Sequence, residues 1–383
     1  MIANLMALSV RARWIIIALV LVVSTYGAWQ LTQLPIDAVP DITNNQVQIN
    51  TQDASLSPVE IEKRVTFPVE TAMAGIPGLK STRSLSRNGF SQVTVIFDEN
   101  VDLYFARQQV SERLVQAQEN LPDGVQPQIG PVTTGLGEVF MYAIDYTNPG
   151  GRGATVRNGQ PGWQSDGSFL TPEGDRLTDD VSRAAYLRTV QDWIIAPQLR
   201  TVNGVAGVDS IGGFEKQYVV EPDATRLAQY GVSYSELAQG LEAANLSVGA
   251  NFVERGGEAY LVRADARIRS LSQIEEAIVA TRGGVPVAVR DIATVRLGGD
   301  LRTGGATMNG HEVVIGTTLM LIGENSRTVA RSVGEQLEAT VRSLPPGIKV
   351  TPVLDRSKLV NATISTVQRN LIEGAILVAI ALF

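Results

Sequence analysis

Two acidic residues offer the clearest candidate chemistry in this sequence. Glu138 follows the Gly-containing segment Thr134–Gly137, and Asp192 lies within Gln191–Trp193. Carboxylate oxygens bind hard and borderline divalent cations, so a carboxylate between two folded units of the chain could hold such an ion. Spacing alone leaves the alternative open that both acids are solvated or paired with basic side chains.

Several other chemistries are excluded by composition. The 383 residues include no cysteine and one histidine, which rules out disulfides, thiolate metal sites, His-rich zinc sites and most His-based catalytic triads. His311 follows the turn signal Asn309-Gly310, and we expect it to be a solvated turn residue. The six methionines do not cluster in the sequence, so a thioether site for a soft metal is not indicated.

The overall balance of residues predicts a folded protein with more than one unit. Hydrophobic residues make up 44% of the chain, enough to build cores, and the length favours two or three folded units. The net charge of −7 argues against nucleic acid as the main partner.

An uncharged apolar run near the N-terminus predicts a transmembrane helix. Trp14–Ile36 contains no charged residue and follows Arg11 and Arg13. A helix of this length would span the hydrocarbon core, and the preceding positive charges would leave the N-terminus in the cytoplasm with the following residues exported. The alternative is a cleaved signal peptide, although no small-residue cleavage site follows the run.

A second apolar run lies at the C-terminal end. Gly374–Phe383 is too short to span a membrane alone, but apolar residues precede it at helical spacing. We therefore expect a helix that is entering a membrane, and a chain that is part of a larger membrane protein. The alternative is a short core helix.

The region between the two apolar runs contains a repeated βαββαβ order, typical of ferredoxin-like units. In the first copy, Ser57 is expected to cap a helix that kinks at Pro68, and a second helix is expected over Asp102–Asn120. Strands are predicted at Gln46–Asn50, Lys80–Ser86, Gln92–Phe97 and near Gln126.

The second copy is split by an inserted region. Its strands are predicted at residues 138–145, 205–211, 313–321 and 349–354, and its helices at 180–199 and 326–342. Residues 147–178 are rich in Gly, Asn, Asp and Pro and are expected to form a long exposed loop. The expected fold is thus an α+β membrane protein. Its predicted segments are residues 1–36, 37–133, 134–216, 217–298, 299–356 and 357–383.

Seven separated segments resemble the heavy-metal efflux branch of the resistance-nodulation-division (RND) transporters. The resemblance extends over essentially the whole chain. The segments are Leu34–Thr43, Ser84–Arg87, Gln92–Phe97, Thr134–Glu138, Gln191–Trp193, Ile211–Phe214 and Leu321–Arg327.

This resemblance implies an inner-membrane homotrimer of a Gram-negative bacterium, completed by a periplasmic adaptor and an outer-membrane channel. It implies a transporter, not an enzyme, that exports divalent cations (zinc, cobalt, nickel or cadmium) by proton antiport. The two units would be porter subdomains, with residues 217–298 forming the docking subdomain. Glu138 and Asp192 would contact the metal cation, and no cofactor is expected.

The resemblance also implies that the proton-carrying acids and the other half of the metal cleft lie beyond residue 383. Two alternatives remain open. One is an RND pump for organic molecules. The other is a membrane-tethered periplasmic binding or assembly module without transport.

Overall fold

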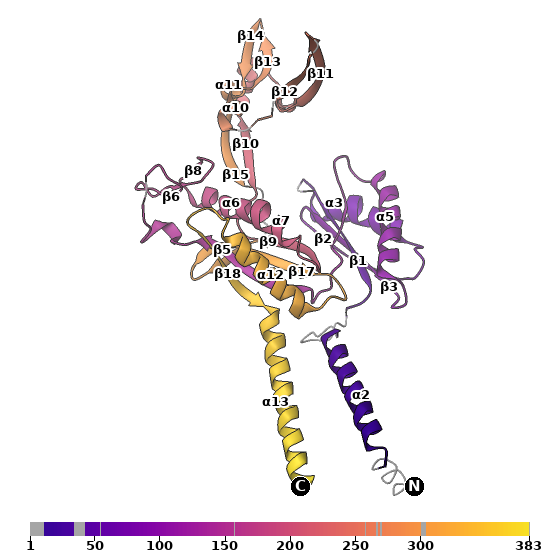
Figure 1. Cartoon of the computed structure of the whole chain (residues 1–383). Helices are drawn as coiled ribbons and strands as arrows, with labels where there is room; N and C mark the ends of the chain where they lie inside the picture. Colours follow the sequence, from indigo (N-terminus) through magenta and orange to yellow (C-terminus); the bar gives the residue numbers. More distant parts are fainter. Residues whose placement is uncertain are drawn as a thin grey trace.

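A folded α+β body carries two long helices that extend from it in the same direction (Figure 1). These helices are α2 (Arg13–Gln33) and α13 (Arg356–Leu382). The computed structural model describes residues 11–33, 43–53, 55–156, 158–256, 258–265, 267–268, 270–299 and 304–382. The end of the predicted N-terminal span, residues 34–36, lies outside these ranges.

The first unit is a four-stranded antiparallel sheet in the order β2-β3-β1-β4. Its strands are β1 (Gln46–Gln52), β2 (Leu79–Arg87), β3 (Phe90–Phe97) and β4 (Gln128–Ile129). Its helices are α3 (Pro58–Ile61), η1 (Glu62–Thr66), α4 (Phe67–Met73) and α5 (Leu103–Gln118). Ser57 and Glu60 form the predicted capping box, and Ala106, Val110, Leu114 and Ala117 form a buried apolar face on α5.

The second unit repeats this strand order with elements that lie far apart in the chain. Strand β9 pairs with β17, which pairs with β5, which pairs with β18. The strands are β5 (Glu138–Tyr146), β9 (Val205–Ile211), β17 (His311–Met320) and β18 (Ile348–Asp355), with β16 (Ala306–Met308) added beside β17. The helices are α6 (Asp180–Val190), η3 (Gln191–Ile195), α7 (Ala196–Leu199) and α12 (Ser326–Val341).

The inserted region is reached through a two-stranded ribbon of β10 (Lys216–Pro222) and β15 (Ala293–Gly299). It lies beyond α6 and away from the two long helices (Figure 1). Its own core joins short helices to a hairpin. The further elements are α8 (Ala224–Tyr230), α9 (Tyr234–Ala244), β11 (Ser247–Arg255), β12 (Glu258–Asp265), α10 (Leu271–Glu275), β13 (Ile278–Arg282), β14 (Val285–Ala288) and α11 (Val289–Ile292).

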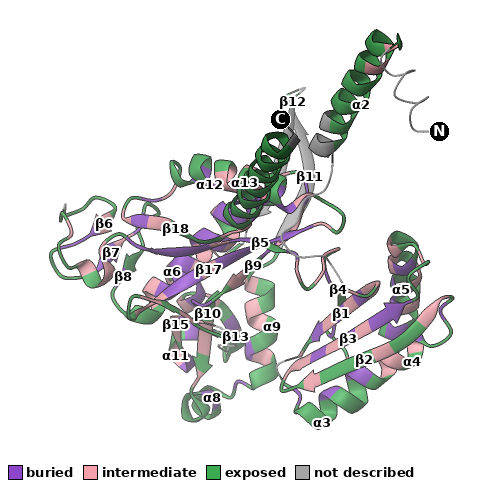
Figure 2. Ribbon diagram, turned by 90° about the horizontal axis from the view of Figure 1, so that it is seen from below, coloured by how far each residue is buried: buried purple, intermediate pink, exposed green. Residues whose placement is uncertain are grey.

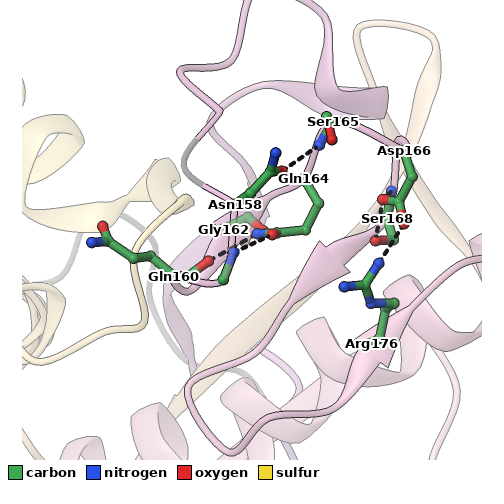
Figure 3. A network of polar contacts seen from close by, with 9 residues as sticks. Asn158, Gln160, Gly162, Gln164, Ser165, Asp166, Ser168 and Arg176 are labelled. Atoms are coloured by element: carbon green, nitrogen blue, oxygen red, sulfur yellow. Dashed lines mark hydrogen bonds and ion pairs between the residues drawn. The ribbon is translucent and has the colours of Figure 1, made fainter.

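The prediction of a plain exposed loop at residues 147–178 is wrong. After the 3₁₀ turn η2 (Pro149–Gly151), the segment forms an antiparallel meander of β6 (Gly162–Trp163), β7 (Phe169–Leu170) and β8 (Arg176–Leu177). The Gln164 amide donates to the carbonyls of Gln160 and Gly162, and Asp166 pairs with Arg176 (Figure 3).

The meander belongs to the core of the second unit. Trp163 and Phe169 are at most 5% exposed and pack against Tyr146 of β5, with ring centroids 5.5 and 4.9 Å from the Tyr146 ring. Burial of such large rings is worth several kcal/mol, which offsets the cost of ordering a polar segment.

The kink predicted at Pro68 takes the form of a π-helical segment. Residues Glu62–Thr66 are π-helical, and Pro68 lies at the start of α4 directly after them. Proline has no backbone N–H to donate to the preceding turn, which favours a widened turn at this point. The second unit contains the same device, because π-helical η3 precedes Pro197.

One stretch of the described helices, Arg356–Ala381 in α13, is long and apolar enough to cross a membrane by length and composition. The apolar run from Gly374 is therefore not a separate short segment, because it continues a helix that begins at Arg356. The apolar part of α2, Arg13–Gly27, is shorter than this test requires. Both helices present exposed side chains along almost their whole length (Figure 2).

Candidate functional site

Three carboxylates from three elements line one open cavity of about 460 Å³ at the edge of the second unit. Glu138 is the first residue of β5, Asp192 lies in η3, and Asp209 lies in β9. The structure therefore brings together both acids that the sequence predicted and adds a third, but the described residues that line the cavity all belong to the second unit, so the cavity is not shared between the two units as expected. The remaining lining residues are Arg188, Arg200, Val208, Ser210, Ile211 and Thr317.

Asp192 is held at the cavity wall by two polar partners. Its Oδ2 lies 2.6 Å from Nε of Arg188, and its Oδ1 accepts a hydrogen bond of 2.5 Å from Ser210. Both side chains of the ion pair are partly shielded, with 25% of Arg188 and 30% of Asp192 exposed. Arg188 also donates to the carbonyl of Gly212 at 3.2 Å. The alternative that this acid is paired with a basic side chain is thus realised.

The position of Asp192 depends on the local helix geometry. A π-helical turn rotates the residues that follow it relative to a continuous α-helix, and such turns often occur at functional sites. The preceding residue, Gln191, is fully buried and accepts a 2.9 Å hydrogen bond from Tyr142. Burial raises the pKa of Tyr142, which keeps this phenol protonated as a donor.

Glu138 is exposed and follows a tight turn. The Gly137 N–H donates to the carbonyl of Thr134 at 2.9 Å, and the Gly137 carbonyl accepts from the Met320 N–H at 2.8 Å. A Cβ atom at position 137 would lie 1.9 Å from the Thr133 hydroxyl oxygen, so this close approach requires glycine. The turn thereby fixes the backbone from which Glu138 projects.

Asp209 is the site residue that the sequence analysis missed. It lies opposite Thr317 in the β9–β17 register, so both side chains are on one face of the sheet. Partial burial raises the pKa of Asp209, and the nearby Arg200 guanidinium opposes that shift. Thr317 is 3% exposed, and its hydroxyl has no hydrogen-bond partner among the described residues. The strand was predicted correctly, but its register against β17 could not be read from local sequence.

The described residues hold no cluster of three or more Asp, Glu or His side chains close enough to form a metal shell. The cavity therefore supplies carboxylates from one side, with Arg188 and Arg200 balancing part of their charge. Such an arrangement can attract a divalent cation and contribute ligands to it, while the remaining ligands would come from elsewhere.

His311 is not a solvated turn residue, as the sequence analysis expected. The turn itself is confirmed, because Asn309 and Gly310 both adopt positive φ. The His311 ring, however, lies with Nε2 2.7 Å from Oδ2 of Asp145, a carboxylate that is 2% exposed, and Lys349 lies 3.6 Å from the same oxygen. This cluster faces a separate cavity of about 300 Å³.

The sequence matches a family model over residues 5–383, described as the AcrB/AcrD/AcrF family. This chain is a member of that family. It is 62% identical to the nickel-cobalt-cadmium resistance protein NccA of Alcaligenes xylosoxydans xylosoxydans and to the nickel and cobalt resistance protein CnrA of Cupriavidus metallidurans. In both comparisons all of this chain aligns with 36% of the relative.

A solved structure described as a heavy metal efflux pump has the same fold. The two superpose with a TM-score of 0.81 at 30% identity, over 98% of this chain and 35% of the other. The α+β class predicted from the sequence is confirmed, and so is membership of the heavy-metal RND branch. The chain spans about a third of the length of these relatives.

Proposed function

We propose that this chain contributes to the inner-membrane subunit of a tripartite pump that exports divalent heavy-metal cations in exchange for protons. The observation that carries the proposal is the convergence of Glu138, Asp192 and Asp209 on one cavity. The resistance proteins that share 62% identity are named for nickel, cobalt and cadmium, which favours these cations, with zinc as a further candidate.

The architecture supports the remaining parts of this proposal. In this proposal α2 and α13 are membrane helices. Residues 37–133 are one porter subdomain, and residues 134–216 with 299–356 are a second. Residues 217–298 form a docking subdomain that faces an outer-membrane channel. The subunit is a homotrimer in the inner membrane, and a periplasmic adaptor completes the assembly. The two long helices support this orientation because they leave the body on the side opposite the inserted region (Figure 1).

The cavity suggests how affinity for a cation can change during transport. Asp192 has two competing partners, the Arg188 guanidinium in the present arrangement and a divalent cation in the loaded one. A shift of β5 relative to η3 would separate Glu138 from Asp192 and weaken cation binding, because two ligands hold an ion only at a suitable spacing. A cation can shift the balance between two conformations of the protein only by as much as its affinities for them differ.

The lining also bears on the two alternatives. No aromatic residue is among the side chains that line this cavity in the described part of the chain, whereas sites for organic molecules are mostly apolar and aromatic. A tethered binding module without transport would also bind cations, so transport must be measured directly.

The test uses the full-length protein that carries this chain. A deletion strain complemented with Glu138→Gln or Asp192→Asn should lose cobalt and nickel tolerance, and the purified variants should bind Co²⁺ more weakly. Proteoliposomes with an imposed proton gradient should accumulate Co²⁺ only with the unmutated protein. The control variant Glu335→Gln removes an exposed carboxylate of α12, 69% exposed, and should behave as unmutated protein. Full metal tolerance in both site variants would refute the assignment.

A further inference from the structure

The first residue of α13 contacts the backbone on both sides of Gly137. Nη1 of Arg356 donates a hydrogen bond to the carbonyl of Leu136 and lies 3.4 Å from the carbonyl oxygen of Glu138. Arg356 therefore links the start of the longest apolar helix to the turn from which a proposed cation ligand projects.

Helix α13 follows strand β18 of the second unit with no intervening loop. Asp355, the last residue of β18, is paired with Phe140 of β5, and α13 begins at the next residue. The carboxylate of Asp355 accepts hydrogen bonds from the Ser357 N–H at 3.0 Å and from its hydroxyl at 2.6 Å. Val360 is fully buried. A change in the tilt of α13 would thus act on the start of β5 directly.

We propose that Arg356 is a positioning residue that fixes Glu138 in the cation cavity and couples the orientation of α13 to cation affinity. The inference rests on the proposed function, because it assigns Arg356 a role only if Glu138 contacts the cation. A guanidinium suits this role since its planar fork presents several N–H donors in fixed directions, whereas a lysine ammonium is a single point charge on a flexible stem.

The expected size of the effect follows from how metal sites depend on their supporting residues. Loss of a group that orients a ligand commonly weakens metal binding about 10- to 100-fold. Arg356→Gln should therefore weaken Co²⁺ binding by about tenfold or more, and Arg356→Lys by a smaller factor. Lys358→Gln removes a positive charge two residues further along α13 from an exposed side chain, and it should leave the affinity unchanged.

The experiment measures Co²⁺ affinity of the purified full-length protein by isothermal titration calorimetry. It adds a double-mutant cycle with Glu138→Gln. If Arg356 acts through Glu138, Arg356→Gln should cause little further loss of affinity in the Glu138→Gln background, whereas a general structural role would reduce affinity in both backgrounds. The unfolding temperature of each variant is recorded, and Arg356→Lys serves for the same cycle if Arg356→Gln does not fold.

The outcomes separate the two proposals. If the unmutated protein binds no Co²⁺, both fail. If Glu138→Gln weakens binding while Arg356→Gln and Arg356→Lys remain within twofold of the unmutated protein, the proposed function stands and the positioning role of Arg356 is refuted. Additive losses in the cycle, or an equal loss in Lys358→Gln, would also refute it.

Discussion

The ion pair between Arg188 and Asp192 should weaken cation binding, so removing the arginine should strengthen it. Asp192 Oδ2 lies 2.6 Å from Nε of Arg188. A metal coordinated by that oxygen at about 2.1 Å would lie no more than about 5 Å from the guanidinium nitrogen. A charge of +2 and a charge of +1 at that separation repel by about 1.7 kcal/mol in a water-like dielectric.

This repulsion predicts that Arg188→Gln binds Co²⁺ at least about tenfold more tightly, since about 1.4 kcal/mol corresponds to a factor of ten. The water-like value is a lower limit because the pair is about 70% shielded from solvent and the effective dielectric is smaller there. Glutamine removes the positive charge and keeps a polar side chain with an N–H donor at this position.

The assay is competition for Co²⁺ between the purified full-length protein and a chromophoric chelator, at fixed pH and ionic strength. Arg331→Gln is the matched control, because Arg331 also pairs with an acid four residues later on a helix but lies outside the cavity at 71% exposure. An unchanged or weaker affinity in a folded Arg188→Gln protein would show that the arginine supports the site, and would refute the competition argument.

Three further predictions concern the second unit, each measured by unfolding of the purified full-length protein. Gly316→Ala should cost about 1–3 kcal/mol or more, because its Cβ would lie 2.2 Å from the Tyr142 ring, whereas Gly334→Ala on α12 should be nearly neutral or stabilising; equal effects would contradict the packing argument. Phe169→Ala should cost about 3–5 kcal/mol, and a loss below 1 kcal/mol would show that the meander is not part of the core. Burial raises the pKa of Asp209, so the protonated acid is favoured in the folded state. Its contribution to folding stability is complete below the unfolded-state pKa of about 4 and is lost as pH rises through the folded-state pKa. Asp209→Asn should therefore raise the unfolding temperature more at pH 7 than at pH 3, and a constant difference would contradict this.

Local chemistry was enough to predict the main helices and strands of the two repeated units. Ser57 caps its helix as expected, since a short polar side chain can accept a hydrogen bond from the first helical turn, and Asp102 caps the helix that was predicted to begin there. The meander was missed because its strands are two residues long, too short for an alternating pattern to emerge. The signal available was Trp163 and Phe169, two large rings in an otherwise polar segment.

The site was predictable only in part. Glu138 and Asp192 were singled out as acids on predicted elements, and the family resemblance strengthened that choice. That both face one cavity became visible only with the fold. Asp209 could not be found in that way. It faces the cavity because β9 pairs with β17 in one register, and a shift by one residue would turn it to the other face of the sheet.

The repeat explains why the cavity chemistry belongs to one unit. Both units place a π-helical segment before a proline, and Gly75 and Gly204 follow the two helices at matching positions. In this alignment Lys63 occupies the position of Asp192. A widened turn and the proline are therefore features of the shared scaffold, and they do not by themselves make a cation site. In the proposed site the carboxylate supplies the ligand, because the same backbone geometry that places Asp192 at the cavity places the positive charge of Lys63 in the first unit.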